Sequence, residues 1–152
     1  MQTQFVIERE PVVTWPVTVE LPRPGGRIEP FRFVAVVRVL SEDEYETIIP
    51  AHGADDDVAA AQDAEIQRRT LRDVLADNAR VLPRLITGWQ GVTAPAGGDV
   101  PIAELPAVLT GPYGRALSVA LWRAIHQVRY GIPAEQTPGA AEGNSAPSPA
   151  AG

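Results

Sequence analysis

Two stretches near the N-terminus alternate apolar and polar residues on either side of a turn-forming segment. The apolar positions of the first stretch are Trp15, Val17, Val19 and Leu21. The second stretch, Phe31 to Leu40, places on one face Phe31, Phe33, Ala35, Val37 and Val39. A period of two is typical of half-buried strands, and Pro22 to Arg27 between them is rich in Pro and Gly. The pattern predicts an antiparallel β-hairpin with a long loop. Because two strands alone are marginally stable, helices or another copy must cover its apolar face.

The middle of the chain carries signals for two helices. Ser41 and Glu44 fit a capping box, which predicts a short helix to about Ile49. Three carboxylates at 55–57 favour the start of a second, longer helix, because they stabilise the positive end of the helix dipole. The apolar positions of this helix recur at three- and four-residue steps and are Ile66, Leu71, Val74, Leu75, Leu82 and Leu85.

Two residues are expected to shape the end of that second helix. Pro83 removes a backbone donor and clashes with the preceding turn, so we expect a kink or break near Arg80–Leu82. Gly88 suits the left-handed cap that ends a helix.

A polar, Gly-rich loop to Asp99 separates these helices from two more. We expect a short helix around Ala103 to Leu109 and a final helix that has Pro112 in its first turn and ends near Tyr130. The inner stripe of the final helix would be Tyr113, Ala116, Leu117, Ala120, Leu121, Ala124 and Val128. The elements together predict an α+β fold in which an N-terminal antiparallel β-hairpin packs on a small bundle of three to four helices.

The last twenty residues differ in composition from the rest of the chain. Fifteen of them are Pro, Gly, Ala or Ser, and nothing apolar larger than Ala is present. Ordering such a segment costs conformational entropy without compensating burial. The sequence therefore predicts one domain over 1–132 and a flexible, disordered Pro/Ala/Gly-rich tail over 133–152.

Charge and cysteine content narrow the classes of function. The formal net charge is −6, which gives no general reason to bind nucleic acid or an anionic membrane. No cysteine is present, so the chain has neither a disulfide framework nor a thiolate metal site. The apolar run Phe5, Val6 and Ile7 is much too short for a signal-peptide core. These features predict a cytoplasmic protein without nucleic-acid or membrane partners.

Few side chains could perform catalysis. The most suggestive cluster is His52 with Asp55, Asp56 and Asp57, but it lacks the spacing of a calcium loop and the ligands of a zinc site. Helix capping explains the three aspartates more simply. Gly25-Gly26 opens onto a strand rather than a helix, so it fits a hairpin turn and not a phosphate loop. We expect no enzyme activity, no cofactor and no metal, with a small enzyme built on the His52 cluster as the competing hypothesis.

Charge is distributed unevenly along the chain. Residues 41–67 hold nine acidic residues and no arginine, whereas 68–84 hold five arginines against two aspartates. Such runs are usually solvated faces. The other interpretation is a docking surface for a basic partner.

The aromatic residues allow a core role and an interface role. Trp122 falls off the expected inner stripe of the final helix, so it either packs under the hairpin or faces a partner. Trp89 follows Gly88, and we expect it to fold back on the helix end as a core anchor rather than to contact a partner.

Several short motifs follow one another along the chain. They are Trp15-Pro16-Val17-Thr18-Val19, the Pro-Gly-Gly turn, Phe31-Arg32-Phe33, Leu40-Ser41-Glu42-Asp43-Glu44, Leu85-Ile86-Thr87-Gly88-Trp89-Gln90-Gly91-Val92, and Leu105-Pro106-Ala107-Val108-Leu109 before Pro112-Tyr113. In this order they resemble the tail assembly chaperones of long-tailed, non-contractile bacteriophages, over about residues 13 to 131. The most specific motif is the Gly-Trp-x-Gly-Val turn. The chain departs from the family pattern at Pro83, and the acidic run 55–57 has no family role to carry over.

The resemblance implies a non-enzymatic protein that works in the cytoplasm of the infected host. Such chaperones keep the long tape-measure protein soluble, recruit tail-tube subunits and are absent from the finished particle. Self-association would be compatible with this role. The candidate residues for a structural motif or a partner contact are Gly88, Trp89, Tyr113 and Trp122. The alternative is a structural virion protein, such as a tail-completion or tube-like subunit, whose hairpin adds edge to edge in a ring.

Overall fold

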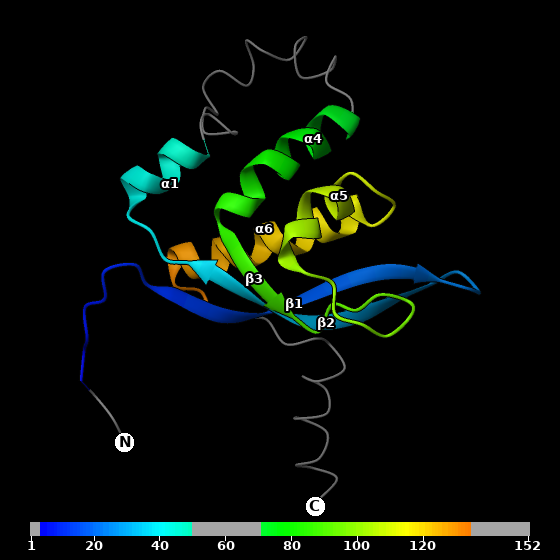
Figure 1. Ribbon diagram of the computed structural model, residues 1–152, viewed down its shortest axis with the longest axis horizontal. Coiled ribbons are helices and arrows are strands. Elements are labelled where there is room, and N and C mark those ends of the chain that lie inside the picture. Colours follow the sequence, from blue (N-terminus) through cyan, green and yellow to red (C-terminus); the bar gives the residue numbers. More distant parts are fainter. Residues whose placement is uncertain (1–3, 50–70, 135–152) are drawn as a thin grey trace, which may run out of the picture.

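A three-stranded antiparallel sheet carries helices on one face (Figure 1). The computed structural model describes residues 4–49 and 71–134. In spatial order the strands are β1 (Val12–Arg23), β2 (Arg27–Arg38) and β3 (Ile86–Gln90). The helices are α1 (Glu42–Ile48), α4 (Leu71–Val81), α5 (Leu105–Leu109) and α6 (Gly114–Tyr130). The predicted α+β class with an N-terminal hairpin is confirmed.

The hairpin is longer and its turn tighter than expected. β1 and β2 pair from Val12 and Arg38 through to Arg23 and Arg27, so the predicted long loop is wrong. The tight turn depends on two glycines with left-handed φ angles, 87° at Gly25 and 76° at Gly26. Pro22 stays within β1 because β1 is an edge strand, where a residue without a backbone donor is tolerated.

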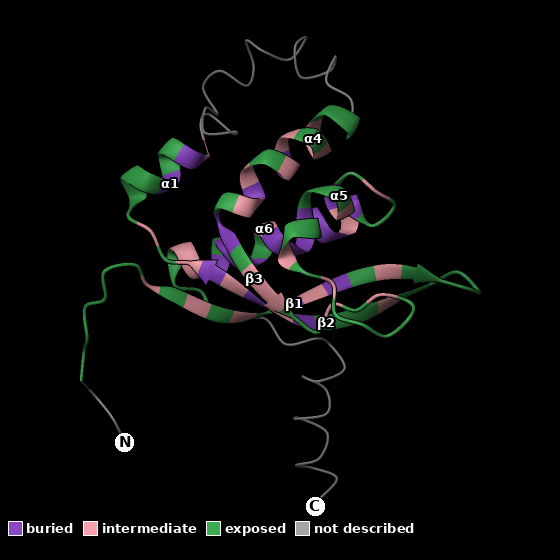
Figure 2. Ribbon diagram, viewed as in Figure 1, coloured by how far each residue is buried: buried purple, intermediate pink, exposed green. Residues whose placement is uncertain are grey.

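The inner face of the hairpin forms one layer of the core. Alternate residues of both strands are buried, as the period of two predicted, and they are Val17, Val19, Phe33, Ala35 and Val37 (Figure 2). Trp15 and Leu21 on β1 are half-buried. Phe31 and Val39, which the pattern placed on the same face, are exposed, and Val39 lies just beyond the end of β2.

The third strand corrects a sequence prediction. Gly88 was expected to end a helix in the left-handed conformation, but it lies within β3, opposite Val36 of β2. The helix ends earlier, as Pro83 predicted: α4 stops at Val81, and a 3-10 turn over Leu82–Arg84 carries the chain into β3. Once Pro83 has ended the helix, the next residues pair with β2 and enlarge the sheet.

α1 begins with the predicted capping box. The Ser41 hydroxyl accepts from the Glu44 N–H at 3.2 Å, and the Ser41 N–H donates to the Glu44 carboxylate at 3.1 Å. The helix ends close to the predicted residue, Ile49, and buries Tyr45 and Ile48.

α6 lies between the sheet and the other helices, with contacts to β1, α4 and α5. Of its predicted inner stripe, Leu117, Ala120, Leu121 and Ala124 are buried. Tyr113 is 58% exposed, so its placement on that stripe was wrong: it caps the helix rather than entering it. Because α6 is covered on two sides, Ser118, Ile125 and Gln127 are buried as well, and the single predicted stripe did not include them. Gly131, with φ 69°, ends the helix as predicted.

Gly114 sets how closely α6 follows α5. A Cβ on this glycine would lie 1.9 Å from the Leu109 carbonyl oxygen, so no other residue fits without moving the backbone. Several sequence predictions lie outside the described residues: the His52 cluster, the helix start at 55–57, Ile66 and nearly all of the tail 133–152.

Candidate functional site

Three tryptophans each donate an indole N–H that ties two elements together. Trp15 on β1 donates to Gln127 Oε1 on α6 at 2.7 Å. Trp89 on β3 donates to the Val100 carbonyl at 2.7 Å, and Trp122 on α6 donates to Asn78 Oδ1 on α4 at 3.2 Å. Gln127 and Asn78 are buried, so these bonds satisfy polar groups that water does not reach.

The Gly-Trp-x-Gly-Val motif has a structural explanation in this fold. The Trp89 ring meets Phe33 edge-on, with centroids 5.9 Å apart, and its N–H holds the loop that follows β3. Gly91, and not Gly88, takes the left-handed conformation, with φ 93°. A Cβ on Gly91 would lie 3.4 Å from the Phe33 Cβ. Trp89 is therefore anchored against the core, as expected, although through β3 and not through a helix end.

Of the other two candidate residues, Trp122 lies in a groove and Tyr113 is an exposed cap. Trp122 lies against α4 rather than under the hairpin, so the first of the two placements that its off-stripe position raised is wrong, and contact with a partner stays a prediction. These four candidate residues do not converge on one site: Gly88 and Trp89 lie on β3, Tyr113 precedes α6, and of the four it is Trp122 that lines the helix groove.

Two apolar grooves flank α6. The first, here named the helix groove, lies between α4 and α6 and has a volume of about 500 Å³. It is lined by Leu71, Val74, Leu75, Asn78, Arg115, Ser118, Val119, Trp122 and Arg123. Leu71 and Val119 are 53% and 55% exposed, which is high for aliphatic side chains. The buried Ser118 hydroxyl beside them has no hydrogen-bond partner among the described residues.

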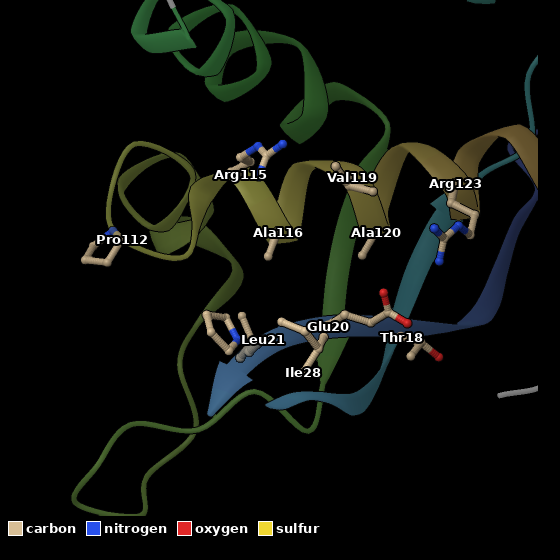
Figure 3. Close-up of a pocket in the computed structure, with 11 residues that line it drawn as sticks. Thr18, Glu20, Leu21, Ile28, Pro112, Arg115, Ala116, Val119, Ala120 and Arg123 are labelled. Atoms are coloured by element: carbon tan, nitrogen blue, oxygen red, sulfur yellow. The ribbon is translucent and has the colours of Figure 1, made fainter. Parts of the chain in front are cut away.

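The second groove, here named the hairpin groove, lies between α6 and the end of the hairpin and has a volume of about 440 Å³. Figure 3 shows Ala116 and Ala120 pointing from α6 toward the hairpin, with Leu21 and Ile28 on the opposite wall. The small alanines leave the space, because the hairpin end diverges from the start of α6. Its remaining lining residues are Thr18, Glu20, Pro22, Pro112, Arg115, Val119 and Arg123.

Arg115, Val119 and Arg123 line both grooves and form what we name the α6 ridge. Neither arginine has an ion-pair or hydrogen-bond partner among the described residues. Arg129, on the next turns of the same helix, differs: its Nη2 lies 2.7 Å and its Nε 3.0 Å from the Glu42 carboxylate of α1. The α6 ridge therefore offers two cations around an exposed aliphatic side chain.

The pKa shifts concentrate at the contact of Arg129 with α1, away from both grooves. The hydrogen bond from Arg129 holds the pKa of the Glu42 carboxyl below its usual value, and the same bond raises the pKa of Arg129. Burial raises the pKa of Tyr45, whose ring lies 5.0 Å from the Arg129 guanidinium carbon. This geometry ties α1 to α6, and Glu42, Tyr45 and Arg129 line neither groove.

Metal-ligating side chains do not gather within the described residues: no group of three His, Asp or Glu residues there could hold an ion. In the same part of the chain, no helix is long and apolar enough to span a bilayer. Comparison with family models, curated proteins and solved structures finds no match to this chain. The main surface feature of the described residues is therefore a pair of apolar grooves that share the cationic α6 ridge.

Proposed function

We propose that the protein is a non-enzymatic tail assembly chaperone, which binds a phage tape-measure protein in the host cytoplasm and helps to recruit tail-tube subunits. The observation that carries the proposal is the helix groove. Its half-exposed aliphatic walls and the flanking Arg115 and Arg123 form a surface for an amphipathic partner. The motif order along the chain points to the same class of protein.

The helix groove fits an elongated helical partner better than a small ligand. Exposed Leu71 on one wall and Val119 on the other leave the groove open along its length. An amphipathic helix binds such a groove through apolar residues spaced three and four apart. The two unpaired arginines favour a partner with acidic residues beside that apolar face, since opposite charges orient an encounter.

The alternative, a structural tail subunit, requires the hairpin to add strands edge to edge. β1 is the free edge of the hairpin, and it contains Pro16 and Pro22. Neither residue can donate a backbone hydrogen bond, and prolines on an edge strand oppose strand addition. The edge therefore favours the chaperone over a ring built by strand pairing.

Purified phage particles and co-expression test the proposal together. A tape-measure protein encoded in the same genome should aggregate when expressed alone, and should stay in solution and co-purify when this chain is co-expressed. Mass spectrometry of purified particles should then detect the tape-measure protein and the tube protein, but not this chain. A stoichiometric amount of the chain in the particles would establish the structural alternative instead.

A further inference from the structure

The segment Gln4–Glu10, here named the N-terminal arm, exposes an apolar run with no cover. Phe5, Val6 and Ile7 are 88%, 66% and 83% exposed. Among the described residues, no other run of three large apolar side chains is as exposed. Figure 1 shows the arm leaving β1 at the end opposite the hairpin turn. Large apolar side chains gathered in water mark a contact surface.

The hairpin groove is complementary to the arm in shape and charge. Its wall residue Ile28 is 63% exposed and half-buried Leu21 lies beside it, so extended chain could cover both (Figure 3). Arg115 and Arg123 outweigh the single acidic residue Glu20, which makes the groove cationic. The arm carries Glu8 and Glu10 against Arg9, so its net charge is negative.

The arm is too short to fill the groove of its own chain. An extended chain spans at most about 3.6 Å per residue, so Ile7 reaches at most about 18 Å from Val12. β1 rises about 3.3 Å per residue, which places Leu21 about 30 Å from Val12 along the strand. The arm leaves at the far end of that strand, so the run Phe5–Ile7 cannot lie across Leu21 and Ile28 of the same molecule.

We propose that the N-terminal arm of one chain binds in the hairpin groove of a second copy. Phe5 and Ile7, which share one side of an extended chain, cover Leu21 and Ile28. The acidic residues that follow face Arg115 and Arg123. Two chains that exchange arms are the smallest assembly in which each hairpin groove is filled. The α4 wall of the helix groove stays open in that assembly. The inference does not rest on the proposed chaperone role, although Arg115 and Arg123 border both the hairpin groove and the helix groove.

Cysteine cross-linking tests the contact directly, because the natural chain has no cysteine. Full-length Ile7→Cys and Ile28→Cys chains are mixed, oxidised and analysed by non-reducing gel and peptide mass spectrometry. We expect a disulfide joining residue 7 of one chain to residue 28 of another. The matched control mixes Ile7→Cys with Val39→Cys, an exposed position at the other end of β2. Linking no stronger than in this control would overturn the proposal. A separate double variant, Ile7→Cys/Ile28→Cys, should link only between chains, and a disulfide within one chain would also overturn the proposal.

A mixing experiment separates the arm from the groove. Light scattering over a concentration series should show wild-type chains associating. Phe5→Asp/Ile7→Asp and Ile28→Asp should each weaken association at least tenfold. Mixing the two variants should restore part of the association, since the mixed pair keeps one of the two contacts, an intact arm in an intact groove. Monomeric wild-type protein at all concentrations, or variants that associate like wild type, would refute the exchange.

Discussion

The two sides of α6 use their polar and charged groups differently. On the side facing the sheet, Gln127 accepts from Trp15, and Leu117, Leu121 and Ala124 are buried. On the outer side, Arg115 and Arg123 have no partner among the described residues and Val119 is exposed. The paired and buried groups on the inner side stabilise the fold, whereas the exposed groups on the outer side contribute little to its stability. The exposed outer side is therefore where we propose contact with another molecule.

Gly114 offers the largest expected effect on the inner side. Gly114→Val places a side chain against the Leu109 carbonyl and should lower the free energy of unfolding by about 3 kcal/mol or more, because the backbone has to move. Urea unfolding measures the change. Gly98→Ala, with nothing within 4 Å of its new Cβ, is the control and should unfold like wild type. Equal stability of the two variants would contradict the close packing of α5 against α6.

The Trp15–Gln127 bond gives the next effect. Trp15→Phe removes the donor and leaves the buried Gln127 amide oxygen unpaired, which should reduce the unfolding free energy by about 1–3 kcal/mol. Adding Gln127→Met removes the orphaned acceptor and should recover part of that loss. If the double variant loses more unfolding free energy than the two single variants together, the hydrogen bond does not couple Trp15 and Gln127.

Arg129, which pairs with Glu42, and Arg123, which has no partner among the described residues, lie on the same helix, α6. Arg129→Gln should lower the melting temperature at neutral pH, whereas Arg123→Gln should leave it unchanged. The folded pKa of Glu42 lies below its ordinary value of 4.5, so the pairing stabilises the fold above that pH and is lost as pH falls through the folded pKa. The difference between wild type and Arg129→Gln should therefore shrink in acid. A difference that persists at low pH would argue against the ion pair as its source.

The elements predicted correctly from sequence depend on local signals. The hairpin alternation, the capping box at Ser41 and the helix break at Pro83 are each set within a few residues. β3 was missed because its five residues are held by pairing with Val34–Val37, about fifty residues away. Its Ile86 and Trp89 also fit a helical stripe, so local sequence did not decide between the two.

The candidate site was less predictable than the fold. Trp122 was singled out correctly as off the inner stripe, and it lines the helix groove. The grooves themselves depend on how α4 and the hairpin end diverge from α6, which no local pattern encodes. The run Phe5–Ile7 was recognised as apolar, but its exposure, and hence its use, depends on where β1 points.

Binding measurements on Leu71→Asp test most directly the claim that the helix groove, between α4 and the outer side of α6, is a contact surface. Leu71 is 53% exposed in the helix groove, and Val12, 51% exposed on the edge strand, supplies the matched control Val12→Asp. Both variants should melt close to wild type, since neither side chain is buried. Leu71→Asp should bind a tape-measure fragment at least tenfold more weakly, and Val12→Asp should bind like wild type. Unchanged binding by Leu71→Asp, or an equal loss in Val12→Asp, would contradict the account.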